Sequence, residues 1–175
     1  RSRPMAVDSS RPFPLVRNKS LNIGALIYDK KKDVTDIATV QVPSVLPRIV
    51  KLPSEEKDVT EIILLEEVIE KNLDKLFLSY DIVCAYPYRI MRNADFSIDE
   101  EETADLLKEI EKQLKQRQWG EVIRLEVDEA MDKKLLKELK NHLGVDDEVV
   151  YKINGPLDLT FLMKVNGHRS EEHTS

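Results

Sequence analysis

The most sharply patterned stretch of the chain is an alternation that passes into a helical signal. Apolar and aromatic side chains occupy every second position from Ile82 to Ile90, which is the period of a strand with one buried face. Ser97 and Glu100 then have the spacing of a capping box, in which each side chain bonds the backbone N–H of the other residue. The pattern predicts a strand followed by a long amphipathic helix that ends at Gly120.

Further strands follow from the same two-residue period. Alternating apolar positions predict a strand over 21–28 and a second over 37–42, and the charged segment 29–33 should join them as a hairpin. Ile123 is expected to share a buried face with Leu125. Shorter strands are expected at 48–52, 122–127 and 149–153.

Apolar positions with helical spacing complete the predicted elements. A helix of about three turns is expected over 65–77, while 61–65 is either a buried strand or the start of this helix. A second amphipathic helix over 135–143 should end at Gly144, and 157–165 also has a helical pattern. A hairpin followed by irregularly alternating helices and strands predicts an α+β fold. We expect a mixed, largely antiparallel sheet with about three to four helices packed on one face.

Composition and charge narrow the class of protein. The chain has 175 residues, enough for one domain with a sizeable core, and its net charge is −6. No basic stripe with interleaved aromatics is present, so nucleic acid is not expected as a partner. The single cysteine, Cys84, is interpreted as a small buried hydrophobe, not as a nucleophile. No apolar run reaches the roughly 18 residues of a membrane-spanning helix, and no secretory signal is present.

Both ends of the chain differ in character from its middle. Residues 1–19 contain three prolines and little periodicity, so they are interpreted as an extended lead-in from a missing N-terminal domain. The domain itself is expected over 20–167. Residues 168–175 are interpreted as a non-native tail, because Arg169–Ser175 is the translation of a common DNA-sequencing adapter. The natural protein is therefore expected to continue beyond about Gly167.

Few residues carry candidate chemistry. No glycine-rich loop follows a predicted strand, so neither dinucleotide nor P-loop phosphate binding is indicated. His142 lies near the polar end of a predicted helix and is interpreted as a surface residue, not as a phosphoacceptor. The acidic run 99–102 is interpreted as helix-start charge, because consecutive helical residues point in different directions and cannot converge on a metal. Arg89 and Arg92 are the best candidates for anion contact, although three positions apart on a strand they should point to opposite faces.

Several longer stretches together resemble a known family. They are Ala6–Pro14 with Asn18–Asn22, Pro43–Pro53, Leu64–Ile69 with Asn72–Phe77, Arg89–Asp95, Gly120–Glu126 and Tyr151–Leu159. In this order and spacing, from about Ala6 to Met163, they resemble the middle, or head, domain of bacterial long-chain polyphosphate kinase. Arg89–Asp95, followed by the acidic capped helix, is the most specific of these matches.

The resemblance implies a role inside a larger enzyme. The family transfers the terminal phosphate of ATP reversibly to polyphosphate, through a phosphohistidine and with magnesium. Its catalytic histidines and phosphate- and metal-binding residues belong to carboxy-terminal domains. We therefore assign no catalytic, cofactor-binding or metal-binding residue here, and the fragment alone is expected to be inactive. The head domain is expected to pack subunits together and to form part of the wall of the active-site tunnel. Arg89, Arg92 and Asn93 are the candidate interdomain or tunnel contacts.

The same resemblance implies the partners. They are the N- and C-terminal domains of the same chain, a second copy bound through the head domain, and ATP, Mg²⁺ and polyphosphate bound by the full-length enzyme. The enzyme is expected in the cytoplasm, with peripheral membrane association as a variant. Two alternatives remain open: a free-standing scaffold or dimerisation domain, and a module that binds a nucleotide or phosphate chain itself. An exposed apolar patch would suit both the head domain of a larger enzyme and a free-standing scaffold. Salt-sensitive binding by the isolated domain would instead indicate the binding module.

Overall fold

The computed structural model describes residues 5–7, 13–93, 107, 110 and 120–163. Most of the predicted helix that follows Ser97 therefore lies outside the described residues, as do its capping box, the acidic run 99–102 and the segment 168–175. The described strands are β1 (Met5–Val7), β2 (Leu21–Asp29), β3 (Val34–Gln41), β4 (Ile49–Leu52), β5 (Glu61–Leu64), β6 (Tyr80–Arg92), β7 (Val122–Asp128) and β8 (Val150–Ile153). The helices are α1 (Leu65–Lys71), α2 (Leu73–Leu76), α4 (Lys133–Leu143) and the short 3₁₀ helix η1 (Asp147–Val149).

Six strands form one twisted sheet in the order β1-β3-β2-β6-β7-β8. Every neighbouring pair is antiparallel except β7 and β8, which run parallel because α4 and η1 connect them as a crossover. The predicted hairpin of β2 and β3 is confirmed, with Asp29 paired to Val34 across the charged turn. Part of the predicted lead-in belongs to the sheet, since β1 pairs with β3 at its edge. The predicted fold class is confirmed: a mixed, largely antiparallel sheet with helices.

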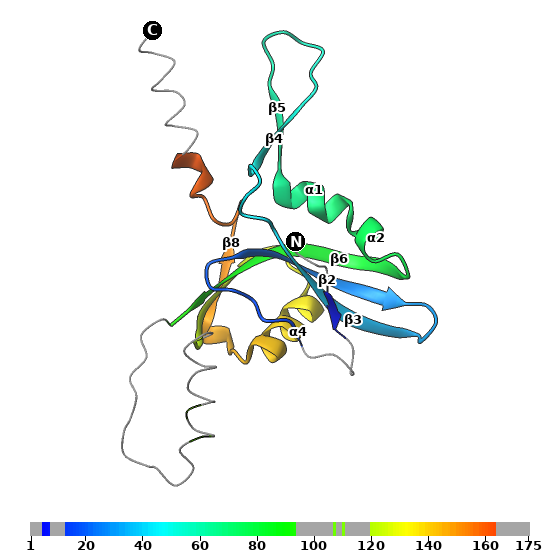
Figure 1. Cartoon of the computed structure of the whole chain (residues 1–175), viewed down its shortest axis with the longest axis vertical. Coiled ribbons are helices and arrows are strands. Elements are labelled where there is room, and N and C mark those ends of the chain that lie inside the picture. Colours follow the sequence, from blue (N-terminus) through cyan, green and yellow to red (C-terminus); the bar gives the residue numbers. More distant parts are fainter. Residues whose placement is uncertain (1–4, 8–12, 94–106, 108–109, 111–119, 164–175) are drawn as a thin grey trace.

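Helices cover both faces of this sheet, so the expectation of helices on one face is wrong (Figure 1). On one face, Leu135 and Leu139 of α4 pack against Tyr88 and Ile90 of β6. On the other face, α1 and α2 cover the second hydrophobic cluster, which contains Ile23 of β2. The central strand β2 is buried along nearly its whole length, because both of its faces carry apolar contacts.

Two β-bulges change which side chains share a face. Between β2 and β6, Leu26 pairs with Cys84 but Ile27 pairs with Ile82, so the strand slips by one residue. Ile82 therefore packs on the α1 face while Cys84 packs on the α4 face, and the predicted single buried face of 82–90 is wrong. A second bulge, between β6 and β7, leaves Ile123 47% exposed, which corrects its predicted placement beside buried Leu125.

The helices after β5 are shorter than predicted. The segment 61–65 is a strand that leads into a helix, and the expected three-turn helix over 65–77 is split into α1 and α2 at Asn72. The Asn72 side chain donates to the carbonyl of Val68 at 2.7 Å, so it competes with the helical backbone at the break. The predicted helix over 157–165 begins only at Phe161 in the described residues, because Asp158 is left-handed with φ of 50°.

The helix α4 ends at Gly144 as predicted and begins two residues before the predicted position 135. The Asp132 carboxylate accepts from the backbone N–H groups of Lys134 and Leu135 at 2.9 and 3.1 Å, an N-cap that the helix requires for its first turn. Gly144 ends the helix with φ of 66°, the left-handed conformation typical of a C-terminal glycine. Local sequence signals therefore fix this helix, and its apolar stripe docks it on the sheet.

Candidate functional site

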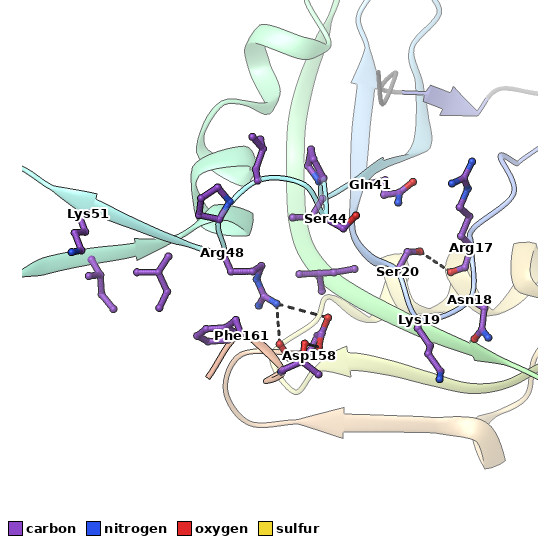
Figure 2. A pocket seen from close by; sticks show the side chains of 18 residues that line it. Arg17, Asn18, Lys19, Ser20, Gln41, Ser44, Arg48, Lys51, Asp158 and Phe161 are labelled. Atoms are coloured by element: carbon purple, nitrogen blue, oxygen red, sulfur yellow. Dashed lines mark hydrogen bonds and ion pairs between the residues drawn. The ribbon is translucent and has the colours of Figure 1, made fainter. Parts of the chain in front are cut away.

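A cleft of about 1250 Å³ lies where three segments of the chain meet (Figure 2). The turn 17–20 before β2 forms one side, the connection 41–51 from β3 into β4 forms a second, and the turn 158–161 after β8 forms a third. The segments are far apart in sequence, so only the folded sheet brings them together. Its apolar floor includes Leu21 and Val42, both of which are nearly completely buried.

Backbone hydrogen bonds shape the turn 17–20. The Ser20 backbone N–H and hydroxyl both donate to the carbonyl of Arg17, at 3.2 and 2.7 Å. Lys19 is left-handed, with φ of 61°, and its backbone N–H donates to the carbonyl of Ile90 at 3.0 Å. The turn is thereby tied to β6, and the side chains of Arg17 and Lys19 line the cleft.

Arg89 and Arg92, the predicted anion contacts, hold this turn in place. Arg89 Nε donates to the Lys19 carbonyl at 3.3 Å. Arg92 Nε donates to the Val16 carbonyl and Arg92 Nη1 to the Gly120 carbonyl, both at 2.9 Å. Burial lowers the pKa of Arg92 from its usual value. The two arginines were predicted to point to opposite faces of the strand, yet their guanidinium groups bind the same short segment, 16–19.

Carboxylates and an aromatic ring occupy the rest of this arginine cluster. Arg89 Nη1 lies 3.1 Å from Glu126 Oε1, and Arg124 Nε lies 3.7 Å from the same oxygen. The guanidinium of Arg124 stacks over the ring of Tyr151 at 3.9 Å. Glu126 is nearly buried, so its charge requires these two cationic partners. The positive charge of Arg89 is therefore largely neutralised within the domain.

Asn93, the third predicted contact residue, follows β6 and is exposed. Its backbone N–H donates to the carbonyl of Glu121 at 2.7 Å. Its own carbonyl lies so close to Gly120 that a Cβ at that position would be 2.3 Å away. Gly120, with φ of 58°, is thus required both by its conformation and by this close approach.

Arg48 forms a buried clamp on the opposite side of the cleft. Its guanidinium makes two hydrogen bonds to the Glu66 carboxylate, at 2.7 and 2.9 Å, and donates to the carbonyls of Leu157 and Asp158, both at 2.9 Å. The side chains of Arg48 and Glu66 are only 13% and 5% exposed. The Arg48 guanidinium also stacks on Phe161 at 4.7 Å. The clamp therefore fixes the turn 157–161 against the start of α1.

Three cations around the cleft have no partner among the described residues: Arg17, Lys19 and Lys51. Figure 2 shows Lys51 at one end of the cleft and Arg17 with Lys19 at the other. Asp158 is the single carboxylate among the described lining residues, and it accepts from the Thr160 hydroxyl at 2.6 Å and lies 4.0 Å from Arg48. The arrangement can hold an anion.

Groups that could perform covalent chemistry lie elsewhere in the described part of the chain. His142 stacks on Phe13 with ring centroids 4.9 Å apart, and its Nε2 lies 3.7 Å from Glu138. Cys84 was predicted to be buried but is only half-buried, packed against the cluster on the α4 face. Burial raises the pKa of its thiol, which disfavours the nucleophilic form. Within the described ranges, no group of three or more potential metal ligands is brought together.

Arg17, Lys19, Arg48 and Lys51 are residues that the sequence analysis did not single out. Their grouping depends on contacts between distant segments, and no local motif marks it. Pro43–Pro53, which contains Arg48 and Lys51, stood out only through its resemblance to a known family. A search for cations beside proline-rich turns could have found the segment, but not its opposite wall.

Comparison with known proteins gives a consistent result. A family model described as "Polyphosphate kinase middle domain" matches residues 3–165. The polyphosphate kinase of Halalkalibacterium halodurans is 50% identical over 164 residues, covering 93% of this chain and 23% of that protein. That of Exiguobacterium sibiricum is 48% identical over 159 residues, covering 90% of this chain and 22% of that protein. The chain thus spans less than a quarter of the length of these relatives.

A solved structure shares the fold. The crystal structure of polyphosphate kinase from Porphyromonas gingivalis superposes with a TM-score of 0.70 over 93% of this chain and 22% of that one. The sequence identity is 22%, so this likeness supports the fold alone. No helix in the described residues is long and apolar enough to cross a membrane.

Proposed function

Because this chain belongs to the polyphosphate kinase family and matches its middle domain, we propose that it is the head domain of an ATP:polyphosphate phosphotransferase. In the full-length enzyme, the terminal phosphate of ATP passes reversibly to polyphosphate through a phosphohistidine, with Mg²⁺. We place the phosphoacceptor, the metal ligands and the ATP site in parts of the enzyme outside this chain. The chain itself is a structural piece and is inactive alone.

The observation that carries this proposal is how the partly buried arginines Arg48, Arg89 and Arg92 are used. Phosphoryl transfer depends on cations placed around the transferring group. Here Arg48 binds Glu66 and two carbonyls, Arg89 binds Glu126, and Arg92 binds two carbonyls. Each guanidinium that the fold orients rigidly serves the fold, as expected for a scaffold.

The proposed role of the scaffold is to join the other domains and subunits. Arg92 and Asn93 lie beside the turn 16–19, so this edge is our candidate for the interdomain or tunnel contact, with Arg89 holding its shape. We also propose that the full enzyme is a homo-oligomer packed through this domain and that it works in the cytoplasm.

A chimeric enzyme tests the proposal. Residues 6–163 would replace the corresponding segment of the Halalkalibacterium halodurans enzyme, and ATP-dependent formation of polyphosphate would be measured. We expect substantial activity from the chimera and none from the 175-residue chain alone. A chimera that folds and oligomerises like its parent but makes no polyphosphate would contradict the proposal. The matched control is a chimera with an unrelated α+β domain of similar length, which should be inactive.

The second candidate function is a free-standing scaffold or dimerisation domain. Its support is a set of strongly exposed apolar side chains, which include Val45, Leu78 and Met163, at 89%, 86% and 76% exposure. Light scattering of the chain would show whether it self-associates, and Leu78→Ser should then weaken the dimer. Activity of the chimera would favour the first function, because a free-standing domain is not expected to replace the head domain of a polyphosphate kinase.

A further inference from the structure

We propose that the cleft is a binding site for a linear phosphate chain, held by Arg17, Lys19 and Lys51. The cleft and its unpaired cations are features of the fold itself. The identity of the anion rests on the proposed function, because that function places polyphosphate beside this domain. The proposal gives the head domain a direct hold on substrate, in addition to its role as a scaffold.

The lining of the cleft is positively charged, whereas the whole chain is negatively charged. The chain carries a net charge of −6, so its surface should on average repel a polyanion. The cleft is lined by four cationic side chains and a single carboxylate among the described residues. Glu66 and Asp158 together offset Arg48, and Arg17, Lys19 and Lys51 remain. An anionic ligand would account for this concentration of unpaired positive charge in an acidic domain.

The shape of the cleft favours an extended anion. Figure 2 shows the unpaired cations at its two ends, with Arg48 and Phe161 between them. A compact anion such as free phosphate reaches one end only, whereas a chain of phosphates can contact both. An aromatic face is a common stacking platform for a nucleotide base. Phe161, the aromatic residue of the lining, already stacks on the Arg48 guanidinium at 4.7 Å. A phosphate chain therefore fits the cleft better than ATP.

Neutral donors and stiff walls complete the site. Gln41 and Ser44 line the cleft between the two cationic ends and can donate to phosphate oxygens. The anchors described above fix both walls, since Arg92 holds the turn 16–19 and Arg48 holds the turn 157–161. Walls that are already ordered reduce the entropic cost of binding. The arginines of the fold are thus positioning residues for the cations that contact the ligand.

The experiment is an isothermal titration calorimetry measurement, in which the 175-residue chain is titrated with long-chain polyphosphate, tripolyphosphate and inorganic phosphate. The test variant is Arg17→Gln/Lys19→Gln/Lys51→Gln. The matched control is Lys133→Gln/Lys134→Gln/Lys137→Gln, which removes the same charge from the exposed side of α4, on the other face of the sheet. Thermal unfolding of each variant confirms that it is folded.

We expect long-chain polyphosphate to bind more tightly than tripolyphosphate, and inorganic phosphate to bind hardly at all. By the counterion-release relation for nucleic acids, three charge contacts should lower the affinity about 20- to 40-fold between about 50 mM and 200 mM salt. The cleft variant should lose at least about tenfold in affinity, on the basis of about two- to fivefold for each exposed charge pair. The control variant should lose less than about threefold.

Two results would overturn the inference. The first is no measurable binding of polyphosphate by the folded chain at low salt, which would leave the cleft as a seat for a neighbouring domain. The second is an equal loss of affinity in the cleft and control variants, which would show nonspecific attraction. Either result alongside an active chimera would leave the proposed function standing and remove only this site. Binding of polyphosphate by the chain alongside an inactive chimera would instead support this site and contradict the proposed function.

Discussion

Removing Arg48 tests the view that internal arginine clamps build the cleft. In the variant Arg48→Met, the side chain keeps most of its apolar volume but loses its charge and every donor. The Glu66 carboxylate, 5% exposed, then remains in the interior without its cation. The carbonyls of Leu157 and Asp158 lose their donors at the same time. We therefore expect both a large loss of stability and a released turn 157–161.

The magnitude follows from the burial of the pair. Breaking a buried ion pair by deleting one partner costs about 3–5 kcal/mol, because the remaining charge is left desolvated. For a domain of this size, each 1 kcal/mol lowers Tm by about 2–4 °C, so Arg48→Met should lower it by roughly 10 °C. The double variant Arg48→Met/Glu66→Leu leaves no buried charge. It should be at least about 1 kcal/mol more stable than Arg48→Met alone.

Urea unfolding followed by circular dichroism measures these differences. The matched control is Lys30→Met, which breaks the ion pair with Asp81 at 3.4 Å, where the two side chains are 70% and 54% exposed. That change should cost less than about 1 kcal/mol, because an exposed pair contributes little. A cost for Arg48→Met as small as that of the control would refute the reasoning. So would a double variant less stable than the single one, since the orphaned charge would then not be the cause.

Three further predictions concern local features of the fold. Gly120→Ala should cost about 2–3 kcal/mol by urea unfolding, because a Cβ there lies 2.3 Å from the Asn93 carbonyl and φ is 58°. The control Gly144→Ala, at a left-handed position with open space around it, should cost about 1 kcal/mol, and equal costs would exclude the clash as the cause. Asp132→Ala should cost about 1 kcal/mol through loss of the α4 N-cap, whereas Asp132→Asn should cost less than half as much; a neutral alanine variant would contradict the cap. Burial and nearby carboxylates raise the pKa of Glu70 from 4.5 to about 7, so the folded state should lose stability as pH rises from about 4.5 to 7. Glu70→Gln should remove that loss and stabilise the chain at pH 8 by about 1 kcal/mol after allowance for solvent screening. A pH profile of stability that the substitution leaves unchanged would contradict the prediction.

Local signals predicted the elements that depend on neighbours in sequence. The hairpin of β2 and β3 follows from alternating apolar residues around a charged turn, and the structure has it at nearly the predicted bounds. The helix α4 follows from an apolar stripe and a terminal glycine. The assignment to an α+β fold and to a family likewise needed only the order and spacing of such segments. For the hairpin and the helix, the deciding interactions join residues close together in the chain.

Register and burial could not be predicted in the same way. The bulge that moves Ile82 to the opposite face from Cys84 depends on which residues of β2 lie across from β6. The exposure of Ile123 has the same origin, in the pairing of β6 with β7. A strand's own sequence specifies its alternation, but the partner strand decides where the alternation slips. Coverage of both sheet faces depends similarly on where distant helices dock.

For the candidate site, too, some features follow from the sequence and others only from the tertiary structure. The sequence by itself determined that Arg89 and Arg92 stand near a junction and that the chain is acidic and belongs to an α+β class. Only the tertiary structure decided that these arginines bind the turn 16–19, that Arg48 pairs with Glu66, and that unpaired cations meet across one cleft. The physical reason is that the partners of a charged side chain are set by through-space distance. Here the interacting residues are separated by up to 110 positions in sequence, and no local pattern encodes such a pairing.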